Sequence, residues 1–176
     1  MKPENRKPPL SEKLLRELAN LATEPSRNKF IASHPQLLKD GVVRQLNEVV
    51  RGKLRENARD ALSLAESSVI IARRLKNKEA LGRSLRSKAN ALYMLGENQQ
   101  ALDFHAEALC IFREIGNHEE EARTLIPSIQ PFILLGKYDL AFAAAEDAKK
   151  IFRNLGDDKR WAHVEINVGK DRKSVV

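Results

Sequence analysis

The segment 96–102, Gly-Glu-Asn-Gln-Gln-Ala-Leu, is followed 40 residues later by 136–142, Gly-Lys-Tyr-Asp-Leu-Ala-Phe. A second pair of segments, Ile-Phe-Arg-Glu-Ile-Gly-Asn at 111–117 and Ile-Phe-Arg-Asn-Leu-Gly-Asp at 151–157, has the same spacing. When residues 81–120 are laid over residues 121–160, ten positions are identical. A fixed period between about 20 and 50 residues indicates structural repeats that stack on one another.

Each unit of this repeat predicts two helices joined by a turn. In the first helix, large and small apolar residues recur at the spacing of one helical face, up to Gly96. A second apolar stripe follows, and Gly116 is placed where a glycine commonly ends a helix. Cys110 falls within that second segment, and we expect it to be a small buried apolar residue. Pro127 and Pro131 interrupt the first helix of the next unit, so we expect that helix to be kinked or to start late.

The order of small and large residues resembles the tetratricopeptide repeat. The matching positions are Leu85, Ala89, Leu92, Gly96, Ala101 and Ala108 in one unit, and Leu125, Phe132, Gly136, Tyr138, Ala141 and Ala148 in the next. The resemblance extends over about residues 41–170. It implies an all-α fold, a right-handed superhelical solenoid of antiparallel helix pairs. The period of about 40 residues exceeds the usual 34 and implies longer helices.

The repeats also divide the chain. We expect residues 1–10 to be disordered, 11–38 to form N-terminal capping helices, 41–80 to be a degenerate unit, 81–120 and 121–160 to be full units, and 161–176 to be the truncated start of a further unit with an aberrant tail. The tail 171–176, Asp-Arg-Lys-Ser-Val-Val, is also what the start of a common sequencing adapter encodes. We therefore expect the natural chain to continue past residue 170.

Composition and charge exclude several classes of function. The formal net charge is +7, but residues 1–60 contribute 13 basic against 8 acidic residues, and 61–169 contribute 15 of each. Because the excess is diffuse, nucleic-acid binding is not expected. No apolar run is long enough to span a membrane, and no segment resembles a signal peptide, so we expect a cytoplasmic protein. With a single cysteine, the chain cannot form an internal disulfide.

The sequence predicts no catalytic activity and no cofactor. None of the histidines, His34, His105, His118 and His163, has a partner at metal-binding spacing. The glycines are isolated at repeat turns rather than grouped in a phosphate-binding loop, and no Gly-x-Ser-x-Gly motif is present. We therefore expect no enzyme, no metal site and no bound cofactor.

The resemblance implies that the first helix of each unit lines a concave surface that binds a protein or peptide. The positions that would face this groove are Arg83, Arg86, Asn90, Tyr93, Arg123, Gln130 and His163. Arg86 and Asn90 resemble half of the clamp with which some members bind a peptide carboxylate, but the following units lack the other half. The predicted function is that of a scaffold or adaptor.

An alternative function follows from a second resemblance. Phe-Ile-Ala-Ser-His-Pro-Gln-Leu-Leu at 30–38, followed by repeats of about 40 residues, resembles the N-terminal region of large bacterial tetratricopeptide proteins, such as CHAT-domain proteins. In that case the repeats would be a regulatory or sensory arm, and their partner would be a C-terminal effector domain in cis.

Overall fold

A computed structural model describes residues 10–162 and Val164, and every regular element within this part of the chain is helical. The helices are α1 (Glu12–Ala19), α2 (Glu24–Ser33), the short 3-10 helix η1 (Pro35–Leu37), α3 (Asp40–Lys53), α4 (Ala58–Leu75), α5 (Lys78–Met94), α6 (Asn98–Glu114), α7 (His118–Leu134) and α8 (Tyr138–Asn154). A further helical stretch begins at Asp158. The predicted all-α fold class is confirmed. Predictions for residues 1–9, His163 and 165–176 lie outside the described residues.

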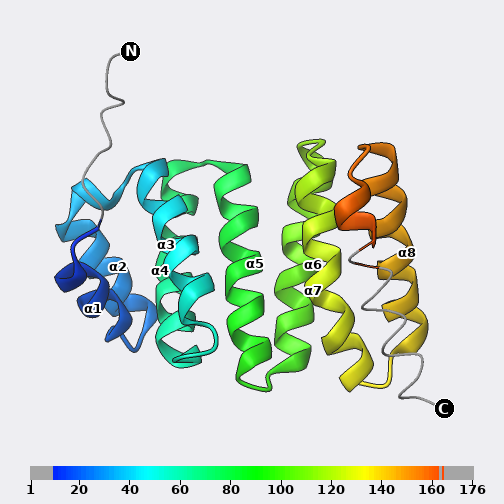
Figure 1. Ribbon diagram of the computed structural model, residues 1–176. Helices are drawn as coiled ribbons and strands as arrows, with labels where there is room; N and C mark the ends of the chain where they lie inside the picture. Colours follow the sequence, from blue (N-terminus) through cyan, green and yellow to red (C-terminus); the bar gives the residue numbers. More distant parts are fainter. Residues whose placement is uncertain (1–9, 163, 165–176) are drawn as a thin grey trace.

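The helices stand side by side in chain order, from α1 and α2 at one end to α8 at the other (Figure 1). Each helix from α3 onward packs mainly against the next one, so successive helices form antiparallel pairs. In addition, α3 contacts α5 and α5 contacts α7, so these three helices form one layer. Helices α4, α6 and α8, each of which follows one of them in the chain, form a second layer. The layer formed by α3, α5 and α7 is the one that carries the candidate site.

Local sequence signals explain where the helices begin and end. The side chains of Asn57, Asn77 and Asn117 accept hydrogen bonds from backbone N–H groups in the first turns of α4, α5 and α7. At the other end, Gly96 and Gly136 follow α5 and α7 with φ of 84° and 69°, the left-handed region that favours glycine. The caps at Asn77 and Asn117 and the two glycines recur with the 40-residue sequence period and separate the helices.

The N-terminal helices cover the apolar side of α4. Leu18 from α1 and Ile31 from α2 are fully buried in one cluster with α3 and α4. The hydroxyl of Ser63 on α4 lies 3.0 Å from the carbonyl oxygens of both Leu18 and Leu21. Arg27, which is also buried, donates to that hydroxyl at 3.2 Å and pairs with Glu66 at 2.7 Å. Both apolar and polar contacts therefore hold this cap in place.

The prediction of a buried Cys110 is wrong, and of the two alternatives for the helix with two prolines, a kink or a late start, the second is wrong. Helix α7 runs without a break from His118 to Leu134 and contains both prolines, so it does not start late. The two prolines have no N–H group, so the carbonyl oxygens of Arg123 and Pro127 lose their usual acceptor role within the helix. Cys110 is exposed rather than buried, because it lies about 200° around α6 from the buried Ala108.

The α3–α4 connection is one residue longer than the later connections within a helix pair. It comprises residues 54–57, whereas residues 95–97 join α5 to α6 and 135–137 join α7 to α8. The loop length does not set the alignment of the first helices, because the buried residues of α3 match those of α5 at an offset of 39 residues. At this offset the buried Val43, Leu46 and Val50 coincide with the buried Gly82, Leu85 and Ala89.

Candidate functional site: a groove over α3, α5 and α7

Two adjoining hollows lie over the layer formed by α3, α5 and α7. Their volumes are about 720 Å³ and 450 Å³. Both are lined by Arg51, Leu54, Asn90 and Pro127, so they form one continuous groove. Hereafter, "the groove" means these two hollows together.

The groove is lined by one stripe of side chains from each of the three helices. The α3 stripe consists of Arg44, Glu48 and Arg51 on α3 together with Arg55 in the turn that follows it. The α5 stripe includes Arg83, Ser87, Asn90 and Met94, and the α7 stripe includes Arg123, Pro127 and Gln130. Spacings of three and four residues place side chains on one face of a helix. At the offsets of 39 and 40 residues, Arg44, Arg83 and Arg123 occupy the same position in successive helix pairs.

Six of the seven positions expected from the sequence to face a groove do line it. Arg83, Arg86 and Arg123 border the smaller hollow, Tyr93 and Gln130 border the larger one, and Asn90 borders both. The seventh, His163, lies outside the described residues. The role of these residues in binding a peptide stays a prediction.

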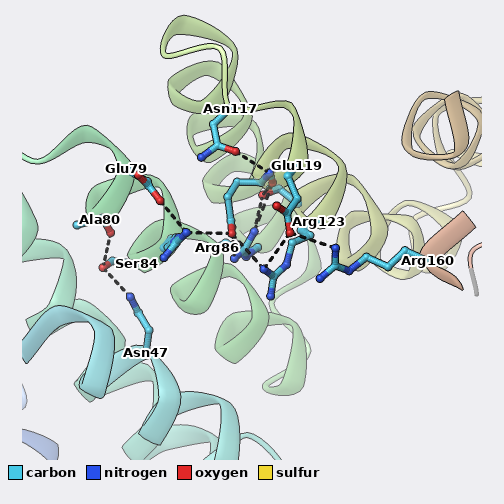
Figure 2. Close-up of polar contacts among 12 residues, drawn as sticks. Asn47, Glu79, Ala80, Ser84, Arg86, Asn117, Glu119, Arg123 and Arg160 are labelled. Atoms are coloured by element: carbon cyan, nitrogen blue, oxygen red, sulfur yellow. Dashed lines mark hydrogen bonds and ion pairs between the residues drawn. The ribbon is translucent and has the colours of Figure 1, made fainter. Parts of the chain in front are cut away.

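Three of the groove arginines surround one buried carboxylate (Figure 2). Arg86 Nη2 lies 2.6 Å from Glu120 Oε2, whereas Arg83 Nη2 and Arg123 Nη1 each lie 3.2 Å from Glu120 Oε1. Only 3% of Glu120 is exposed. Glu79 and Glu119 extend this network by pairing with Arg83 and Arg123.

The protonation of this cluster is set by burial and by charge. Burial raises the pKa of Glu120, but the guanidinium groups of Arg86, Arg83 and Arg123 outweigh burial and hold the pKa below its usual value. Burial lowers the pKa of Arg86, which Glu120 partly offsets. Arg86 also donates to the carbonyl oxygen of Glu120 at 3.3 Å and to Thr124 Oγ1 at 3.2 Å. Its guanidinium therefore joins α5 to α7, and is not free to act as half of a carboxylate clamp.

The α3 arginines were missed in the sequence. A 40-residue offset carried back from Arg83 ends on Val43, which is buried, instead of Arg44. The apolar residues of α3 could have indicated the correct alignment, because their burial pattern matches that of α5 only at an offset of 39 residues. Within the described part of the chain, Arg44 and Arg55 have no ion-pair partner, and Arg51 pairs only with the exposed Glu48.

The two ends of the groove differ in character. Six arginines and two glutamates line the whole groove, an excess of four positive charges, and most of the arginines border the smaller hollow. The larger hollow is bordered by Leu54, Tyr93, Met94, Ile126, Ile129 and Val164. Met94 is 43% exposed there. The groove thus combines a basic end with an apolar end.

Two further features, a metal site and a membrane-spanning helix, are absent from the described residues. In residues 10–162 and Val164, no three His, Cys, Asp or Glu side chains are close enough to hold a metal ion. Likewise, no helix within that range has the length and apolar character needed to cross a membrane.

The fold has a counterpart among solved structures. The chain is similar to the crystal structure of BtubC (BKLC) from P. vanneervenii, with a TM-score of 0.71 and 20% sequence identity. The similarity covers 93% of this chain but 65% of that protein, so the chain spans less than two thirds of its length. No protein-family description matches the sequence. No curated protein matches it either.

Proposed function

We propose that this chain is a tetratricopeptide-like helical repeat protein of the cytoplasm, a non-catalytic interaction module that binds a peptide segment of another protein in the groove. The observation on which the proposal rests is the continuous groove formed by equivalent positions of three helices. Helix pairs that repeat every 39 or 40 residues, together with the layer of first helices, support the repeat assignment.

Asn90 supports the peptide-binding role most directly. Its side chain borders both hollows, and no other described residue forms a hydrogen bond with it. An amide side chain can donate to a peptide carbonyl and accept from a peptide N–H. A half-buried amide that no neighbour satisfies, at the centre of a groove, is suited to bind the backbone of an extended ligand.

The surroundings of Asn90 give the groove a fixed shape. Glu120 and Arg86 join α5 to α7, and Asn47 of α3 donates to Ser84 of α5 at 3.3 Å. Ser84 is fully buried and also lies 2.8 Å from Ser68 Oγ. A ligand that enters a groove with fixed walls loses less free energy to ordering of the protein than one that must order a loop.

A peptide display library tests the proposal. The immobilised full chain is used to select peptides, and each selected peptide is then measured against Asn90→Ala/Tyr93→Ala. Tyr138→Ala is the matched control, since Tyr138 is a tyrosine exposed to 44% outside the groove. We expect the groove variant to bind each selected peptide at least about tenfold more weakly than the unchanged chain does. The control variant should bind it with the affinity of the unchanged chain. Selection of no peptide, or equal binding by the groove variant, would overturn the proposal.

Exposed apolar residues favour a second candidate, a regulatory arm that packs against an effector domain in cis. Leu134, Leu140 and Phe142 are 60%, 52% and 41% exposed around the turn from α7 to α8. Leu102, at the position of Phe142 one unit earlier, is only 6% exposed. Sequencing the gene beyond the last codon tests this candidate. An open frame that encodes further helices or an effector domain would support it, and a stop codon would remove it.

A further inference from the structure

We infer that the ligand of the groove is an acidic peptide segment with one large apolar side chain, whose carboxylates pair with the arginine stripe of α3. This inference rests on the proposed function and specifies its ligand. The first argument is charge, because six arginines and two glutamates line the groove. A groove with such an excess attracts ligands of opposite charge.

The arginines of α3 are the ones available to a ligand. Arg83, Arg86 and Arg123 already share the carboxylate of Glu120. By contrast, Arg44 and Arg55 are exposed and have no ion-pair partner within residues 10–162 and Val164, and Arg51 pairs only with Glu48, which is itself exposed. A ligand carboxylate can therefore pair with α3 without breaking an ion pair within the fold.

The spacing of this stripe fits an extended peptide that lies along α3. A helix rises about 1.5 Å per residue, so Arg44 and Arg51 are separated by roughly 10 Å along the axis of α3. Arg55 follows in the turn after the helix. In an extended chain, side chains on one side recur about every 6.6 Å. A peptide with acidic residues at alternate positions can therefore present carboxylates to both Arg44 and Arg51, and a further acidic residue beyond them reaches Arg55.

The apolar end supplies the second half of the specificity. Arg55 borders the same hollow as Tyr93, Met94 and Ile126. An acidic residue at Arg55 therefore brings a neighbouring peptide side chain to an apolar hollow of about 720 Å³. Methionine adapts to side chains of different shape, so this hollow suits a leucine, phenylalanine or tryptophan of the ligand. The phosphates of a nucleic-acid backbone would pair with the arginines, but the backbone has no apolar group that fills the hollow.

Fluorescence anisotropy with the full chain and defined peptides tests the inference. The probe is a fluorescein-labelled peptide of about twelve residues, with Asp or Glu at alternate positions and one central Leu. Two comparison peptides replace every carboxylate by its amide, or the Leu by Ser. We expect the acidic peptide with Leu to bind, each replacement to weaken binding about tenfold or more, and added salt to weaken it further.

Charge-reversal variants assign the binding to α3. Arg44→Glu/Arg55→Glu should weaken binding of the acidic peptide about tenfold or more. Lys29→Glu/Arg59→Glu, which makes the same change in net charge at exposed residues outside the groove, should remain within about threefold. Equal loss in both variants would mean that binding depends on net charge alone, and would overturn the inference. A labelled single-stranded oligonucleotide that binds more tightly than the peptide, with the same dependence on α3, would also overturn it.

The outcome separates this inference from the proposed function. If the display library yields neutral or basic peptides that need Asn90 and Tyr93, the function stands and the inference of an acidic ligand is wrong. If no peptide depends on Asn90 and Tyr93, the proposed function itself is wrong.

Discussion

Arg86 on α5 and Glu120 on α7 form an ion pair of 2.6 Å between consecutive helix pairs. The two residues are 34 positions apart in the chain. Arg83 and Arg123 contact the other oxygen of the same carboxylate. One acidic side chain therefore contacts three guanidinium groups at the centre of the structure.

Glu120→Gln should destabilise the fold by about 3 kcal/mol, because it leaves these arginines without their shared carboxylate. The free energy of unfolding in urea measures the loss. Glu79→Gln is the control, since Glu79 pairs with Arg83 but is 47% exposed at its side chain, and it should change stability by no more than about 0.5 kcal/mol. Equal losses in both variants would contradict a central role for Glu120.

His105 should make the fold less stable in mildly acidic solution. It is 1% exposed, and burial together with the nearby charge of Arg86 lowers its pKa from 6.5 to about 3. Between pH 6.5 and 3, His105 therefore binds a proton in the unfolded chain but stays neutral in the folded chain. Stability is therefore fully present above pH 6.5 and is lost as the pH falls toward 3, at up to about 1.4 kcal/mol per pH unit.

His105→Leu should remove that loss between pH 6.5 and 5. The guanidinium groups around Glu120 hold the pKa of its carboxyl below its usual value, so its protonation does not add to the loss in this range. It should also stabilise the fold by about 1 kcal/mol at pH 7, because neither ring nitrogen of His105 has a hydrogen-bond partner among the residues that the structure describes. Urea unfolding at several pH values measures both effects. The same fall in stability with pH in His105→Leu as in the unchanged chain would contradict this prediction.

Two glycines should respond in opposite ways to alanine. A Cβ added to Gly82 would lie 2.7 Å from Phe112 Cζ, so one of the two helices must shift, and we expect a net loss of about 1 kcal/mol. At Gly52 in α3 a Cβ meets nothing within 4 Å, and the better helix propensity of alanine should stabilise the fold by about 0.5 kcal/mol. Thermal unfolding distinguishes the two outcomes. A gain at Gly82 would contradict the tight contact between α5 and α6.

Arg27→Ala should weaken the attachment of the N-terminal cap. The side chain is 7% exposed and contacts Glu66 and Ser63 on α4, so its removal should cost about 3 kcal/mol. Limited proteolysis should then cleave within α1 and α2 before the later helices. Arg16→Ala, at an arginine 80% exposed whose ion pair is with Glu12, serves as the control and should leave the cleavage rate unchanged.

The sequence predicted the helices well because their ends depend on local residues. Asn77 and Gly96 begin and end α5 through their own backbone preferences, which a single sequence reveals. Burial of Leu85 and Ala89 follows from their spacing on one helical face. The exposure of Cys110 was mispredicted because apolar character alone does not say on which side of α6 it lies.

The candidate site was predicted only in part. Asn90 and Tyr93 were found because they occupy clear positions in a regular unit. Arg44 and Arg55 were missed because the buried residues of α3 follow an offset of 39 residues to α5, one less than the 40-residue period of the sequence repeat. The pairing of Arg86 with Glu120 could not be predicted, since it depends on how two helices far apart in sequence pack and on which rotamers their side chains adopt.

The two prolines of α7 have a consequence for motion. Proline removes two of the backbone hydrogen bonds that would otherwise hold the helix together around Arg123 and Pro127. Local opening of a helix costs less free energy where such bonds are absent. Amide hydrogens in this part of α7 should therefore exchange with deuterium faster than their equivalents in α5, even though the ion pair of Glu120 with Arg86 holds the two helices together.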